Sequence, residues 1–138
     1  MRELNQRGVA ALEFCLVAAP LFTLMFVIFD LGRYAITMQS LRMLANAGSR
    51  AVMIGCYTDA VIKKNAPTAC TGDPLPSLAA KQAVAPFLFN GGLTPTLNVP
   101  APAGNALTVT ASQPGFTMLM PIWGTALNAP SASTSIPF

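Results

Sequence analysis

A run of 21 residues from Val9 to Phe29 contains a single charged side chain, Glu13. As an α-helix, this run spans ~31 Å at about 1.5 Å per residue, which is close to the thickness of a bilayer's hydrocarbon core. A secretory signal peptide has a shorter apolar core that ends at a small-residue cleavage site. The nearest Ala-x-Ala motif, Ala45–Ala47, lies well beyond the run. The sequence therefore predicts a transmembrane helix over residues 9–29 that stays in the mature protein.

The composition agrees with a chain held in a membrane. Of its 138 residues, 53% are hydrophobic and only 9% are charged, whereas soluble domains carry about a quarter charged residues. The net charge is +3, but the five charged residues after Arg50 are scattered and form no basic stripe for nucleic acid. With no histidine and three cysteines, the chain has neither a four-ligand zinc set nor a Cys–His nucleophile pair. We expect no enzyme activity, metal, cofactor, nucleic acid or small-molecule substrate.

The helical pattern continues beyond Asp30, so the sequence predicts one helix over residues 9–55 with Gly55 as its end. Apolar residues recur every three or four positions, which is typical of one face of an amphipathic helix. This stripe consists of Leu31, Tyr34, Met38, Leu41, Ala45, Gly48 and Val52. Asp30 and Arg33 are expected to pair on the helix surface, for about a few tenths of a kcal/mol.

Two features of the apolar run concern its packing. Pro20 lacks the amide that would bond to Leu16, which predicts a kink. Ala11, Cys15 and Ala19 recur at four-residue spacing, and such small residues allow another helix to approach closely. Cys15 is accordingly interpreted as a packing residue.

After Cys56 the chain changes character, because eleven of its twelve prolines lie there. Ser77 is a candidate N-cap for a short helix that Pro86 limits. Alternating or β-prone residues predict short strands over 97–99, 106–112, 116–120 and 131–136. The predicted fold class is α+β: a long N-terminal helix and a small antiparallel head over residues 56–138. Phe116 and Trp123 are expected in the core of that head rather than on an adhesive surface.

Cys56 and Cys70 close a 15-residue loop. As a disulfide this loop would stabilise the fold by roughly 3 kcal/mol on the chain-entropy model. A disulfide would also place the head in an oxidising compartment. The alternative is that the two residues are unrelated buried thiols.

Glu13 is the costly residue of the apolar run. A lone carboxylate at mid-bilayer costs about 2.5–3.5 kcal/mol on insertion scales, and less near the edge. No lysine, arginine or histidine lies between Val9 and Phe29. The partner of Glu13 must therefore come from another chain or from a charge that processing creates.

The stretch R-G-V-A-A-L-E-F, residues 7–14, resembles the processing site of Flp-type prepilins. Continued through F-D-L-G-R-Y, it is similar to the N-terminus of TadE-like pseudopilins of tight-adherence (Tad) pili. The resemblance extends over about residues 6–55 and does not distinguish TadE from TadF. It implies that residues 1–8 are a basic leader, which a prepilin peptidase removes by cutting between Gly8 and Val9. Glu13 and Phe14 then become the fifth and sixth residues of the mature chain.

The resemblance further implies that Glu13 pairs with the Val9 amine of a neighbouring pilin or pseudopilin subunit. The function expected is that of a minor pseudopilin for assembly of a Tad-type (type IVc) pilus. Its partners would be the prepilin peptidase, other subunits and the Tad secretion platform in the bacterial inner membrane. The N-terminus would be cytoplasmic and the head periplasmic, or on the pilus or cell surface after assembly. The alternative is a single-pass envelope protein that keeps Met1 and binds a partner through its head.

Overall fold

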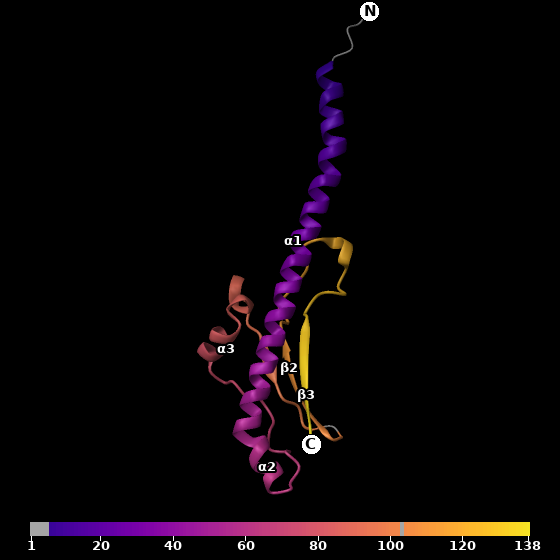
Figure 1. Cartoon of the computed structure of the whole chain (residues 1–138). Helices are drawn as coiled ribbons and strands as arrows, with labels where there is room; N and C mark the ends of the chain where they lie inside the picture. Colours follow the sequence, from indigo (N-terminus) through magenta and orange to yellow (C-terminus); the bar gives the residue numbers. More distant parts are fainter. Residues whose placement is uncertain (1–5, 103) are drawn as a thin grey trace, which may run out of the picture.

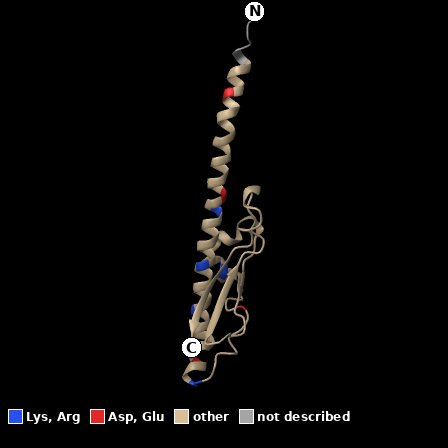
Figure 2. Ribbon diagram, turned by 90° about the vertical axis from the view of Figure 1, so that its right-hand side faces the viewer, with Lys and Arg blue, Asp and Glu red and all other residues tan. Residues whose placement is uncertain are grey.

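A long helix forms the axis of the molecule, and the sheet and α3 lie along one half of it (Figure 1). The structure is a computed structural model that describes residues 6–102 and 104–138. Helix α1 runs over Gln6–Val52 and is followed by a π-helical turn, η1 (Met53–Tyr57), and a short helix, α2 (Thr58–Ile62). The first half of α1 projects beyond the head (Figure 1) and is almost without charged side chains (Figure 2).

The end of the helical structure differs from the sequence prediction. Gly55 was expected to be the end, yet it lies within η1, and helical structure continues to Ile62. The widened turn is held by Thr58, whose backbone N–H and side-chain hydroxyl both donate to the carbonyl of Met53. These bonds satisfy the local backbone, so glycine does not terminate the helix here.

The head contains a three-stranded antiparallel sheet with strand order β1-β2-β3. Strand β1 covers Thr96–Asn98, β2 covers Ala106–Ser112 and β3 covers Ser131–Pro137. Along β2, Leu107, Val109 and Ala111 are buried while their neighbours are half-buried, which is the alternation that the sequence predicted. The α+β fold class and three of the four predicted strands are confirmed.

The core lies between this sheet and the second half of α1. Leu41, Leu44 and Ala45 are fully buried in one cluster with residues of all three strands. At Gly48 the helix comes so close to the sheet that an added Cβ would lie 3.1 Å from Leu97 and Val109 side-chain atoms. This close approach explains why a glycine lies in the helix interior, although glycine there costs about 1 kcal/mol relative to alanine.

The segment between α2 and the sheet is tied to the helix in two places. Cys56 and Cys70 form a disulfide, as predicted, with their Cα atoms 5.8 Å apart. Helix α3 (Leu78–Val84) begins at Ser77, whose hydroxyl accepts from the Ala80 amide as an N-cap. A 3₁₀ segment, η2 (Pro86–Gly92), follows α3, and its buried Leu88 joins the core.

Gly48→Leu should destabilise the head by roughly 1–3 kcal/mol, because the new side chain has to displace Leu97 and Val109 from a packed interface. The measurement is a urea titration in detergent, followed through emission of Trp123, the only tryptophan in the chain. Gly32→Leu is the matched control, since nothing lies within 4 Å of a Cβ at Gly32. Equal urea midpoints for the two variants would show that the close approach at Gly48 is wrong.

Candidate functional site

The projecting half of α1 is the most unusual surface of the molecule. An 18-residue window of this helix has a mean hydropathy of 2.3, and none of that window is buried within the chain. Leu12, Leu16 and Val17 are 66%, 70% and 64% exposed. In length and composition the helix is able to cross a membrane. The apolar surface therefore needs either lipid or other helices around it.

The predicted cleavage bond lies in the first turns of α1. Gly8 is helical and exposed, with nothing within 4 Å of a Cβ placed on it, and Val9 is 58% exposed. A peptidase that binds an extended chain has to unwind this turn. Glycine makes unwinding easier by about 1 kcal/mol relative to alanine. The leader's first five residues, which belong to the same prediction, lie outside the described residues.

Glu13 and Phe14 are both on the exposed surface of α1, and Phe14 is 69% exposed. Among the side chains that the structure describes, Glu13 makes neither an ion pair nor a hydrogen bond. Val9 and Glu13 are four residues apart, so they share one face of the helix. A carboxylate on an otherwise apolar membrane helix is a candidate functional residue.

The packing features of the apolar run are also exposed. Ala11, Cys15 and Ala19 all face outward, and Cys15 is a free thiol. The helix continues through Pro20, and Thr23 Oγ1 donates to the Ala19 carbonyl at 2.8 Å. The kink at Pro20 stays a prediction.

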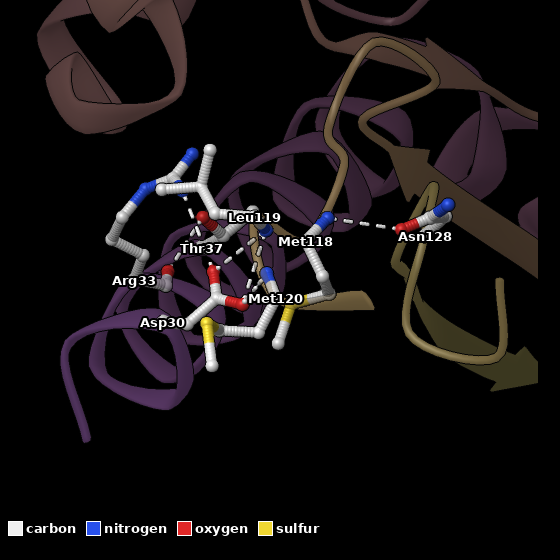
Figure 3. Close-up of polar contacts among 7 residues, drawn as sticks. All are labelled: Asp30, Arg33, Thr37, Met118, Leu119, Met120 and Asn128. Atoms are coloured by element: carbon white, nitrogen blue, oxygen red, sulfur yellow. Dashed lines mark hydrogen bonds and ion pairs between the residues drawn. The ribbon is translucent and has the colours of Figure 1, made fainter. Parts of the chain in front are cut away.

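The apolar run ends at a polar junction centred on Asp30 (Figure 3). Asp30 is only 1% exposed, and its carboxylate accepts hydrogen bonds from the backbone amides of Leu119 and Met120 at 3.0–3.2 Å. Arg33 Nη1 lies 3.5 Å from Asp30 Oδ1, and its guanidinium carbon lies 5.4 Å from the centre of the Phe116 ring. This junction holds a loop of the head against the helix at the point where the apolar run stops.

At this junction the structure differs from the sequence prediction in two respects. Residues 116–120 were expected to form a strand but are irregular. Three of their amides bond to side chains instead: Leu119 and Met120 donate to Asp30, and Met118 donates to Asn128 Oδ1 at 3.0 Å. The predicted Asp30–Arg33 pair does form, but Asp30 is buried rather than on the helix surface.

Sequence reasoning missed the burial of Asp30 because its partners are backbone amides 89 and 90 residues away. The one available signal was an acid placed directly after an apolar run.

Phe116 and Trp123 were both expected in the core of the head, and this is confirmed for the first of them only. Phe116 is buried at 3% exposure, whereas Trp123 is only partly buried.

Asp30→Ala should speed hydrogen–deuterium exchange at the Leu119 and Met120 amides, because two part-buried donors lose a charged acceptor, at a cost of about 1.5–3 kcal/mol. Asp59→Ala is the matched control, since Asp59 is 71% exposed and forms its ion pair with Lys63 on the surface. Unchanged exchange at the two amides in Asp30→Ala would contradict the junction.

Comparison with known proteins supports the resemblance noted in the sequence. Comparison with curated proteins and with solved structures gave no match. A family model does match: the one described as TadE-like protein aligns with residues 8–50. That range starts at Gly8 and includes the projecting half of α1, Glu13 and Asp30. The N-terminal segment of this chain, over residues 8–50, is TadE-like.

Proposed function

We propose that the chain is a minor pseudopilin that takes part in assembling a Tad-type pilus. A TadE-like segment implies a Tad pilus-associated protein with an apolar N-terminal helix. The observation that carries the proposal is the exposed apolar half of α1 with the carboxylate of Glu13, which has no partner among the described side chains. Residues 9–29 anchor the chain in the bacterial inner membrane, with the N-terminus cytoplasmic and the head periplasmic.

Processing after Gly8 is the first step of the proposed mechanism. The cut removes the leader and creates an α-amino group on Val9, at the new start of α1. Glu13 then lies one turn into the helix, where the positive end of the helix dipole favours a carboxylate. The cut therefore supplies a positive charge that the apolar run otherwise lacks.

Assembly is the second step. Glu13 is about 6 Å from Val9 along the helix axis, at about 1.5 Å per residue. A neighbouring subunit shifted by about one turn would bring its Val9 amine level with this carboxylate. Burying an unpaired charge costs several kcal/mol, whereas a well-placed pair offsets much of that cost. The pair therefore favours one register, while Ala11, Cys15 and Ala19 allow close approach of the helices.

Gly8→Leu should block processing, because a bulky side chain enters the cleavage position and stabilises the helical turn that has to unwind. Intact-mass measurement of the chain from its native membrane gives the result. Loss of residues 1–8 is expected in the wild type and retention of Met1 in the variant. A mature wild-type chain that still starts at Met1 would overturn the proposal and favour the envelope-protein alternative.

Glu13→Ala should leave membrane insertion and cleavage intact but abolish assembly, seen as loss of surface pili by electron microscopy. Leu12→Ala is the control, since Leu12 is a comparably exposed neighbour whose loss removes only apolar surface. Normal pili from a Glu13→Ala strain would refute the pairing role of Glu13.

A further inference from the structure

The loop that Asp30 holds is itself strongly apolar. Residues Met118–Trp123, named here the apolar loop, read M-L-M-P-I-W, carry no charge and end in the 3₁₀ turn η3 (Pro121–Trp123). Leu119 is 74% exposed and Ile122 is 61% exposed, although both have large apolar side chains. An uncharged loop with this exposure needs a partner, because water contact with so much apolar surface is unfavourable.

The position of the apolar loop identifies that partner. Its Leu119 and Met120 amides bond to Asp30, the residue that directly follows the last apolar residue of the 9–29 run. In Figure 1 the loop is the part of the C-terminal region that lies beside the middle of α1, on the side toward the projecting half. The loop and the end of the apolar run are therefore at the same level along the helix axis.

The chemistry of the apolar loop fits the boundary between lipid headgroups and acyl chains. Asp30 satisfies two of the loop's backbone amides, which lowers the cost of leaving water. Tryptophan is enriched at this depth in membranes, and the loop holds the chain's only one, Trp123. Arg33 extends its partly exposed side chain beside the junction, where a long cation can reach headgroups.

We propose that the apolar loop is a second membrane contact, which inserts Leu119 and Ile122 into the leaflet from which α1 emerges. The inference rests on the membrane anchor of the proposed function but concerns the head rather than the filament. Lipid is favoured over a protein partner because the loop continues the apolar surface of the anchor at the same level. With two contacts, the head is held down on the bilayer instead of swinging about a single helix.

The test moves the only tryptophan to chosen positions in the full-length chain. In a Trp123→Phe background, Leu119→Trp places the probe in the apolar loop. Ile62→Trp is the matched control, because Ile62 is 75% exposed, almost the same as Leu119, but lies at the far end of the head in α2. Each variant is reconstituted at a low protein-to-lipid ratio into phosphatidylcholine–phosphatidylglycerol vesicles, with or without bromine at a shallow acyl position.

Brominated lipid should quench Leu119→Trp emission by about two-fold or more and leave Ile62→Trp nearly unchanged, since only the first residue reaches the interface. Wild-type Trp123 gives a second reading without any substitution in the loop and should also be quenched. Equal, weak quenching of Leu119→Trp and Ile62→Trp, with wild-type Trp123 unquenched as well, would overturn the proposal.

Two further outcomes separate the possible failures. A chain that does not float with the vesicles in a density gradient would overturn both the anchor and the loop contact. A chain that floats but shows a blue shift of Leu119→Trp only as the protein-to-lipid ratio rises would mean that a second copy covers the loop. That result would refute the lipid contact and leave the proposed function standing.

Discussion

The packing of the second half of α1 on the three-stranded sheet determines the rest of the structure. Leu41, Leu44 and Ala45 are completely buried there, and Gly48 brings the helix into direct contact with β1 and β2. Because the head covers only this half, the first half of the same helix projects with its apolar side chains exposed. One continuous helix thus serves two environments, a protein core over one half and an apolar environment over the other.

Periodicity in the sequence was sufficient for the elements whose partners are regular. The 21-residue apolar run, the alternation along β2 and the serine cap of α3 each predicted the observed element. The amphipathic stripe was right at Leu41, Ala45, Gly48 and Val52 but included Leu31, which is 38% exposed. It also omitted Leu44, because a stripe read from spacing alone does not show how wide the covering sheet is.

The junction at Asp30 could not be predicted from the sequence, for a different reason. The strand predicted over residues 116–120 has strand-like composition, but composition does not show which acceptor its amides will find. In the structure that acceptor is a side chain from α1, so the segment bonds to a helix rather than to a neighbouring strand. Similarly, Gly55 has the residue type of a helix end, while the bonds from Thr58 to Met53 allow the helix to continue through it. For Glu13 the sequence and the structure agree that no partner is present among the described side chains.

The head is fastened to the N-terminal helical segment, α1 through α2, at both of its ends. Near α2 the Cys56–Cys70 disulfide makes a covalent tie, and at the opposite end Asp30 binds the apolar loop. Fastening at both ends changes how the head responds when tension is applied along α1. Such tension would act on the helix–sheet contact in shear, between the two ties. The two ties would therefore keep the shape of the head while the helix is under tension.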